Sequence, residues 1–282
     1  MLGGCSLRIR KVINNNVVSC VDSDGQELVV MGRGLGFGAK PGMTLDASAV
    51  EKIFRMDSPE QTRRLKDVFS QLPPEVLDLC TRIIDYAKTA IRRELNESIY
   101  LTLSDHILFA LNLSSQGMSL PNPLLTEVRV FYPAEFAVGK YALERIQAEM
   151  GKSLGEGEAA SIALHLVNAE YSGSMNATMH ATHVLHPMVE ILENWPELKL
   201  NRQHLFYDEL IVHIKFMALQ AFSQAEGEWV DAGRINGLVQ DFPQEFACAK
   251  AITDYLSRQS DTAVPAQEQA YLALCIHRAC IS

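Results

Sequence analysis

The sequence lacks three features that would place a protein in a membrane or outside the cell. No apolar run approaches the roughly 18–20 residues that a membrane-spanning helix needs. The six cysteines, at positions 5, 20, 80, 248, 275 and 280, form no Cys-x-x-Cys pair that would indicate a metal site or a disulfide scaffold. Neither a basic nor an apolar segment precedes Leu2-Gly3-Gly4-Cys5, which therefore does not fit a lipoprotein signal. We expect a cytoplasmic protein with reduced thiols and no membrane insertion.

The sequence is also short of positive charge. Its 282 residues include 25 Lys and Arg against 34 Asp and Glu, a net charge of −9, which argues against general affinity for nucleic acids. Residues 1–50 nevertheless hold five basic and four acidic residues, whereas the remainder holds 20 and 30. The composition, 48% apolar and 21% charged, excludes the disordered and collagen-like classes. We infer a small specific module attached to an acidic body.

The first 55 or so residues have the pattern of β-strands. Ser6–Val12, Asn16–Val21 and Glu27–Met31 are alternating or β-branched, and turn-forming residues separate them. We predict a small antiparallel unit, which at this size would gain a larger core by dimerising. Ser58-Pro59-Glu60 indicates a linker and the start of a helix, and from there the pattern is helical.

The helical part contains an internal repeat. Three pairs of segments match: Tyr132–Ala137 with Phe242–Ala247, Glu158–His165 with Glu268–Cys275, and His106–Phe109 with His213–Phe216. The offset is 110 residues for the first two pairs and 107 for the third. Collinear matches at nearly one offset predict two duplicated helical domains of about 105 residues each.

A glycine-rich stretch follows the predicted strands. Gly32–Gly38 does not fit Gly-x-Gly-x-x-Gly or a phosphate-binding loop, and Pro41-Gly42 stands where a helix would have to follow. Two interpretations stay open. A loop that offers one cation, Arg33, one aromatic ring, Phe37, and bare backbone suits single-stranded or bulged RNA. Alternatively, the glycines serve only the positive φ angles of a tight hairpin.

One histidine run has the superficial appearance of a metal site. His180, His183 and His186 are spaced by three residues, so on a helix their rings drift apart by about 60° per step. Such rings do not converge well on one ion. We interpret the run as the solvated start of a helix and expect no metal.

The repeat singles out three other histidines: His106, His165 and His213. A capping-box pattern at Thr102–Asp105 predicts that His106 lies in the first turn of a helix, where a neutral imidazole is favoured. These residues are either hydrogen-bonded core histidines or acceptors of a phosphoryl group, which needs only an accessible neutral ring and a donor protein. No triad partner or His-Glu-x-x-His pattern accompanies them, so we expect neither an enzyme nor a cofactor.

Motifs along the whole chain, including those that contain these histidines, resemble the motifs of one protein family. Three N-terminal motifs resemble the co-antiterminator RNA-binding domain of transcriptional antiterminators of the β-glucoside operon type: Lys11–Val18, Val29–Phe37 and Ile53-Phe54. Three later motifs resemble the two phosphotransferase-system regulation domains of that family: Ser104–Ile107 and Ala163–Ala169 in the first, and Val212–Phe216 in the second.

The resemblance implies a fold and a function. A small antiparallel all-β RNA-binding domain over residues 1–60 would precede two duplicated all-α helical-bundle domains over residues 70–175 and 177–282. A homodimer would bind a hairpin in the leader mRNA and prevent intrinsic termination ahead of a sugar-utilisation operon. By position in the motifs, the RNA surface would consist of Lys11, Asn16, Gly32, Arg33, Gly34 and Phe37.

The resemblance also implies how the protein is controlled. His106 and His165 would receive phosphate from the sugar permease, enzyme II of the phosphotransferase system, which would switch the protein off. His213 would receive phosphate from the phosphocarrier HPr, which would favour the active dimer. On a helix at a dimer interface, an added phosphate must find cations or force the interface apart.

The sequence departs from the family pattern at two positions. Ala39 stands where family members often carry a basic or polar residue, and Cys275 replaces the second histidine of the last domain. His277 lies two residues further on, about 200° round a helix, and is not in register with the missing ring. An alternative function is a DNA-binding activator with the same regulation domains. It would require a helix-turn-helix unit where residues 1–55 have strand signals.

Overall fold

The computed structural model describes residues 7–55, 58–119, 121–171, 174–223 and 242–280. The chain divides into two compact units. The first unit comprises residues 1–122 and 134–170, and the second comprises residues 123–133 and 171–282. The segment Leu2-Gly3-Gly4-Cys5 lies outside the described residues.

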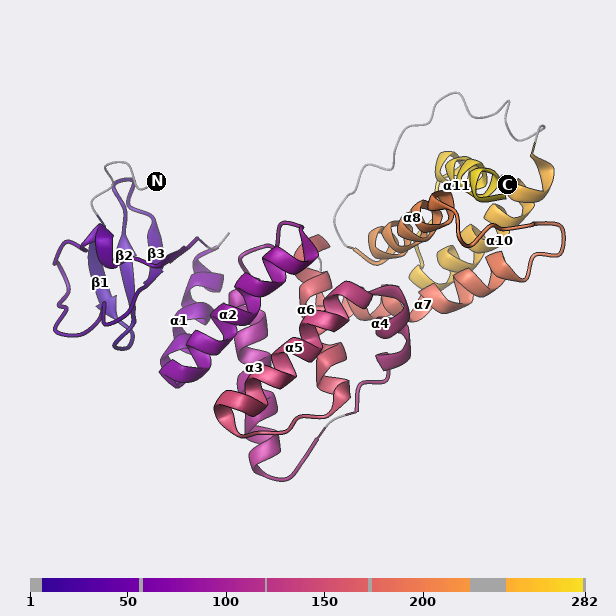
Figure 1. The fold of residues 1–282 in the computed structure, drawn as a ribbon. Helices are drawn as coiled ribbons and strands as arrows, with labels where there is room; N and C mark the ends of the chain where they lie inside the picture. Colours follow the sequence, from indigo (N-terminus) through magenta and orange to yellow (C-terminus); the bar gives the residue numbers. More distant parts are fainter. Residues whose placement is uncertain (1–6, 56–57, 120, 172–173, 224–241, 281–282) are drawn as a thin grey trace. The chain divides into compact units, whose positions relative to one another are not determined.

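The first unit begins with a four-stranded antiparallel sheet in the order β1-β2-β3-β4 (Figure 1). The strands are β1 Arg8–Val12, β2 Val17–Val21, β3 Glu27–Met31 and β4 Lys52–Phe54. The three strands predicted from the alternating pattern are confirmed. The fourth has only three residues, pairs with β3 through Val30 and Ile53, and follows a 3-10 turn at Ala47–Ala49.

Both faces of the sheet are buried, each in a different core. One face and its flanking loops form a small core that belongs to the sheet alone: Leu7, Ile9, Val18, Cys20, Leu28, Val30 and Leu45. The other face joins the helical core of the unit through Val17, Val29, Met31 and Phe54. The sheet is therefore docked on the helices that follow it.

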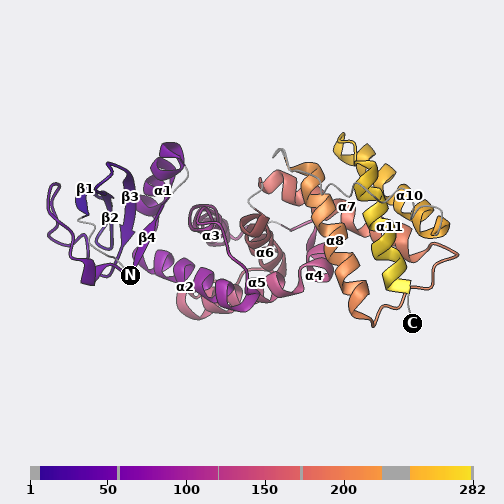
Figure 2. The same ribbon diagram turned by 90° about the horizontal axis from the view of Figure 1, so that it is seen from above.

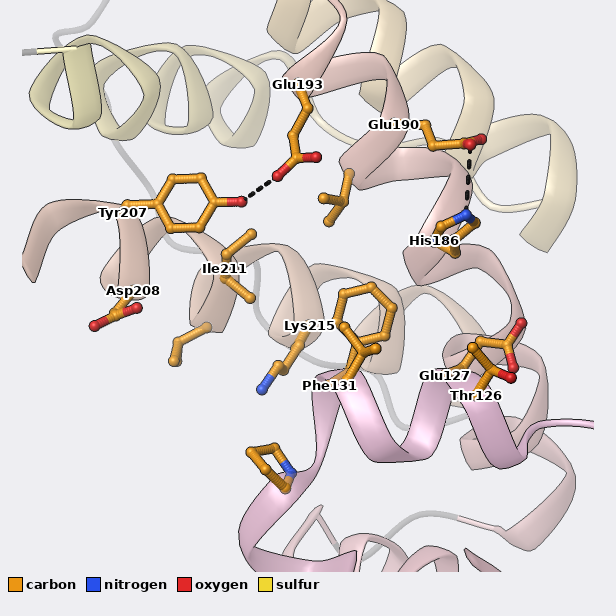
Figure 3. A pocket seen from close by; sticks show the side chains of 14 residues that line it. Thr126, Glu127, Phe131, His186, Glu190, Glu193, Tyr207, Asp208, Ile211 and Lys215 are labelled. Atoms are coloured by element: carbon orange, nitrogen blue, oxygen red, sulfur yellow. Dashed lines mark hydrogen bonds and ion pairs between the residues drawn. The ribbon is translucent and has the colours of Figure 1, made fainter. Parts of the chain in front are cut away.

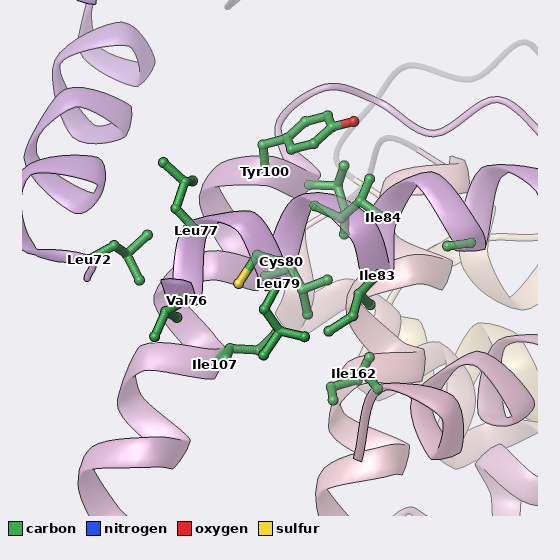
Figure 4. Packing of buried hydrophobic residues seen from close by; sticks show 14 of the residues in the cluster. Leu72, Val76, Leu77, Leu79, Cys80, Ile83, Ile84, Tyr100, Ile107 and Ile162 are labelled. Carbon is green, nitrogen blue, oxygen red and sulfur yellow. The ribbon is translucent and has the colours of Figure 1, made fainter. Parts of the chain in front are cut away.

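Five helices complete the first unit: α1 Pro59–Gln71, α2 Pro74–Ile91, α3 Ile99–Ser115, α5 Pro133–Met150 and α6 Glu156–Tyr171. The predicted start at Ser58-Pro59 is confirmed, because the Ser58 hydroxyl accepts a hydrogen bond from Gln61 N and Pro59 opens the helix. The buried face of α2 supplies Val76, Leu77, Leu79, Cys80, Ile83 and Ile84 to the core, which also takes in Tyr100, Ile107 and Ile162 (Figure 4).

The second unit is helical throughout its described residues (Figure 2). Its helices are α4 Leu125–Phe131, α7 Met175–Glu193, α8 Leu205–Phe222, α10 Pro243–Ser260 and α11 Ala266–Cys280. Although α4 lies between α3 and α5 in the sequence, it packs against α7 and belongs to the second unit.

The internal repeat appears in the order of the helices. The segment with His106 lies on α3 and its counterpart with His213 on α8, while the other matched segments fall on α5 and α10 and on α6 and α11. Each pair has nearly the same length, 17 and 18, 18 and 18, and 16 and 15 residues. The fold class predicted from the sequence is confirmed: a small antiparallel sheet followed by a duplicated helical body.

One local prediction is wrong. His106 does not lie in the first turn of its helix, because α3 already begins at Ile99. The Asn96 side chain accepts a hydrogen bond from Ser98 N just before this start, and Ser104 is buried within the helix instead of capping it. The helix begins early because Ile99, Tyr100 and Leu103 are core residues, so packing overrides the local capping pattern.

Within the described residues, no helix combines the length and the apolar character that crossing a bilayer requires.

Candidate functional site

The glycine-rich loop after β3 is tied to the turn between β1 and β2. The backbone N–H of Gly32 donates to the Asn16 carbonyl at 2.9 Å, and the N–H of Gly34 donates to Oδ1 of Asn16, also at 2.9 Å. The N–H of Gly36 donates to the carbonyl of Asn15 at 2.9 Å. Asn16 therefore holds the loop in place through both its backbone and its side chain.

Each glycine of this loop has a local structural reason. Gly34 and Gly38 have φ angles of +70°, a backbone conformation that residues with a side chain rarely adopt. A Cβ on Gly32 would lie 1.9 Å from the carbonyl oxygen of Ala49, and one on Gly36 would lie 2.0 Å from that of Asn14. The hairpin interpretation of the glycines is thus correct for Gly34 and Gly38 and wrong for Gly32 and Gly36, which allow close approach of the backbone and have no positive φ. It leaves open what the loop presents.

The loop presents an aromatic ring and one cation to solvent, and strand β1 presents a second cation. Phe37 is 81% exposed, which is unusual for so large an apolar side chain. Lys11 and Arg33 are also exposed, while Gly32 is buried and Asn16 is half-buried. An exposed ring and exposed cations on one small domain can stack on a base and contact phosphates. Ala39, where the sequence departs from the family, packs against the small core of the sheet.

In the first unit, His106 and His165 lie next to each other. Their ring centroids are 4.8 Å apart, and Nε2 of His106 lies 3.0 Å from Oε2 of Glu158 on α6. The two atoms are at ion-pair distance without the alignment of a hydrogen bond. Burial, together with a smaller effect of the neighbouring His106, lowers the pKa of His165 to about 3, so this ring is neutral.

In the second unit, His213 has the equivalent partner. Its Nε2 lies 3.0 Å from Oε1 of the buried Glu268 on α11, and its ring meets Tyr271 edge-on at 4.8 Å. Cys275 is buried one turn beyond Tyr271, and burial raises the pKa of its thiol to about 11. A protonated buried thiol is a poor nucleophile, so Cys275 does not replace a histidine ring chemically.

The remaining histidines lie apart from these pairs. Nδ1 of His277 lies 3.0 Å from Oε1 of Glu245 on α10, and its ring packs on Phe242, so it faces away from Glu268 as its register predicts. His180, His183 and His186 are exposed along α7. In the part of the chain that the structure describes, no three His, Cys, Asp or Glu side chains are arranged to hold a metal ion.

Glu158 and Glu268 are site residues that sequence reasoning did not select. Both open the repeated motif that ends at His165 and Cys275, so the signal was present in the repeat itself. Their pairing with His106 and His213 needed the fold, because 52 and 55 residues separate the partners.

A cavity of about 580 Å³ lies among α4, α7 and α8 of the second unit (Figure 3). Its floor includes Phe131 and Ile211, and at its edge the Tyr207 hydroxyl donates to Oε1 of Glu193 at 2.6 Å. His106, His165 and His213 do not line it. The cavity is therefore separate from the His106–Glu158 and His213–Glu268 pairs.

Comparisons with known proteins match the whole chain to one family. The CAT RNA binding domain family matches residues 7–63, and the PRD domain family matches twice, over residues 81–169 and 188–279. Transcription antiterminator LicT of Bacillus subtilis is 36% identical over 96% of this chain and 98% of its own length. The beta-glucoside operon antiterminator of Dickeya chrysanthemi is 37% identical over 96% of each chain.

A solved structure agrees with the sequence comparisons. The crystal structure of GlcT CAT-PRDI matches 58% of this chain and 98% of its own with a TM-score of 0.53 and 31% identity. Proteins of this kind regulate transcription by binding RNA and are not enzymes. The chain belongs to the family of transcription antiterminators in which a CAT RNA-binding domain precedes two PRD domains.

Proposed function

We propose that this chain prevents intrinsic termination by binding a hairpin in a leader mRNA, in response to a sugar. In this proposal residues 1–60 form the RNA-binding module and act as a cytoplasmic homodimer, with residues 70–175 and 177–282 as the two regulation domains. The observation that carries it is that the glycine-rich loop exposes Phe37 and Arg33, and that strand β1, whose turn is hydrogen-bonded to this loop, exposes Lys11. Gly32, Gly34 and Asn16 would supply backbone and amide contacts to the RNA.

The histidine–glutamate pairs supply the control in this proposal. His106 and His165 would be phosphorylated by the sugar permease, enzyme II, when no sugar is imported, and this would inactivate the protein. His213 would be phosphorylated by HPr and would favour activity. A phosphoryl group adds about 1.5–2 negative charges, which a carboxylate 3.0 Å from the ring nitrogen would repel.

RNA binding by loop variants of the full chain tests the proposal. Phe37→Ala and Arg33→Ala should weaken binding to the leader hairpin, and loss of a base stack alone should cost about 1–3 kcal/mol. Phe109→Ala is the matched control, because it removes another exposed phenylalanine, 52% exposed, on α3. Fluorescence anisotropy with labelled leader RNA gives the dissociation constants. Wild-type affinity in both loop variants would rule out this loop as the RNA surface.

A further inference from the structure

Three of the proposed RNA-contact residues line a polar cleft of about 530 Å³ within the first unit. Asn16, Gly32 and Arg33 belong to its first wall, together with Met31 and Glu51. Helix α2 forms the opposite wall with Asp78, Thr81, Arg82 and Asp85. Part of the RNA side of the CAT domain therefore faces the helix that opens the regulatory part of the chain.

The charges of this cleft are unsuited to RNA. Three carboxylates, those of Glu51, Asp78 and Asp85, face two guanidinium groups. One guanidinium, that of Arg82, is engaged in an ion pair with Glu149 of α5, and one carboxylate, that of Asp85, is engaged with Lys52. Arg33 is then the main cation left for a phosphate. Burial raises the pKa of Asp78, whereas the positive charges of Arg82 and Arg33 oppose this rise, which places Arg33 within electrostatic range of the carboxylate.

The sheet is held against α1 and α2 by packing and by polar contacts. Phe54 of the sheet meets Phe69 of α1 edge-on, with ring centroids 5.4 Å apart, in a shared buried core. Nζ of Lys66 on α1 lies 2.6 Å from Oε1 of Glu27, and Nζ of Lys52 lies 2.5 Å from Oδ1 of Asp85. The contact between sheet and helices is thus an interface with its own core.

We infer that Asp78 and Asp85 limit the RNA affinity of the full chain by occupying the space next to Arg33 that RNA phosphates would take. In the docked arrangement, an RNA strand that approaches Arg33 meets two helix carboxylates, so it must bind against their charge or displace α2. The two carboxylates are affinity-determining residues that lie outside the CAT domain. This inference rests on the proposed RNA-binding role of the loop.

Neutral isosteric substitutions in the full chain test the inference. The probe is the RNA transcribed from the leader of the chain's own operon. The double variant Asp78→Asn/Asp85→Asn should bind it about tenfold more tightly than wild type near 0.1 M salt, because two repulsive charges are removed. The gain should shrink as salt is raised. Glu94→Gln/Glu144→Gln is the matched control, since it removes two exposed carboxylates of the same unit that do not line the cleft and should change affinity less than about twofold.

Single variants separate repulsion from loosened docking. Asp85 pairs with Lys52, so Asp85→Asn also weakens the interface, whereas Asp78 is not part of that pair. Asp78→Asn alone should therefore give about a threefold gain at the same salt. Equal affinities for wild type and the double Asn variant, or equal gains in both double variants, would overturn the inference. If wild type and every variant fail to bind the leader RNA, the proposed function itself fails.

Discussion

The carboxylate of Glu268 lies 3.0 Å from Nε2 of His213, and Glu158 stands in the same relation to His106. A phosphoryl group on the ring then brings negative charge close to the carboxylate. Each carboxylate should therefore oppose phosphorylation of the ring that it faces.

Removal of one of these carboxylates should make phosphorylation easier. Two unit charges 4 Å apart repel by about 1 kcal/mol in water and about 4 kcal/mol near a protein surface. Glu268→Gln should therefore raise the equilibrium phosphorylation of His213 by HPr at least about fivefold. Quantitative mass spectrometry of the peptide with His213 measures this. Glu209 lies on α8, the helix of His213, but it is paired with Arg278. Glu209→Gln should therefore not change the phosphorylation of His213.

The acceptor in the second unit should be His213 alone. Cys275 is a buried, protonated thiol, and His277 is paired with Glu245 on another side of α11. Labelling of the second PRD domain by HPr in the full chain should disappear in His213→Ala and remain unchanged in His277→Ala. Acid-labile phosphate on residues 177–282 of His213→Ala would show that another acceptor exists.

The neutral ring of His165 should make the stability of the first unit depend on pH. Its pKa is about 3 in the folded chain and about 6.5 when unfolded, so below pH 6.5 the unfolded state binds a proton that the native state does not. The contribution of His165 to the free energy of unfolding is fully present above pH 6.5. It falls by up to about 1.4 kcal/mol per pH unit between pH 6.5 and 3. Urea unfolding should show wild type losing more stability than His165→Gln between pH 7 and 5. Equal losses of stability in the two proteins would contradict the lowered pKa of His165.

At the scale of elements, local patterns predicted those whose signal is contained in adjacent residues. The strands before Met31 have alternation and turn residues, and Ser58-Pro59 marks the start of α1. Strand β4 escaped prediction because three residues carry little pattern, and it forms only by pairing with β3. The capping pattern at Thr102–Asp105 misled because burial of Ile99 extends α3 past it.

The close packing of α5 on α6 depends on one glycine. A Cβ on Gly139 would lie 2.2 Å from the carbonyl oxygen of Ala159, so Gly139→Ala must push the helices apart despite the better helix propensity of alanine. We expect a net loss of about 1–2 kcal/mol in the free energy of unfolding, measured with urea. Gly155→Ala, which meets nothing within 4 Å, should leave stability within about 0.5 kcal/mol of wild type. The second unit has Ala249 at the repeat-equivalent position.

At the scale of the whole molecule, the repeat at 110 residues predicted the duplication without any structure. It also selected His106 and His213 from the eight histidines of the chain. The sequence could not show which carboxylate faces each ring, because that depends on how α3 packs on α6 and α8 on α11. Nor could it show that α2 faces Arg33, since this contact depends on the docking of the sheet.

The two units should act on transcription in opposite directions. With no inducing sugar, His106→Ala cannot carry the inhibitory phosphate and should read through the terminator, whereas His213→Ala lacks the stimulatory phosphate and should stay low even with sugar. A reporter placed behind the leader terminator, in cells with an intact phosphotransferase system, measures both. His186→Ala changes an exposed histidine of α7 and should behave as wild type.

The double variant His106→Ala/His213→Ala shows which of the two inputs dominates. High read-through would mean that loss of inhibition suffices, and low read-through would mean that the phosphate of the second unit is needed to hold the active dimer together. Silence of His106→Ala under every condition would show that its ring serves the fold and not the switch.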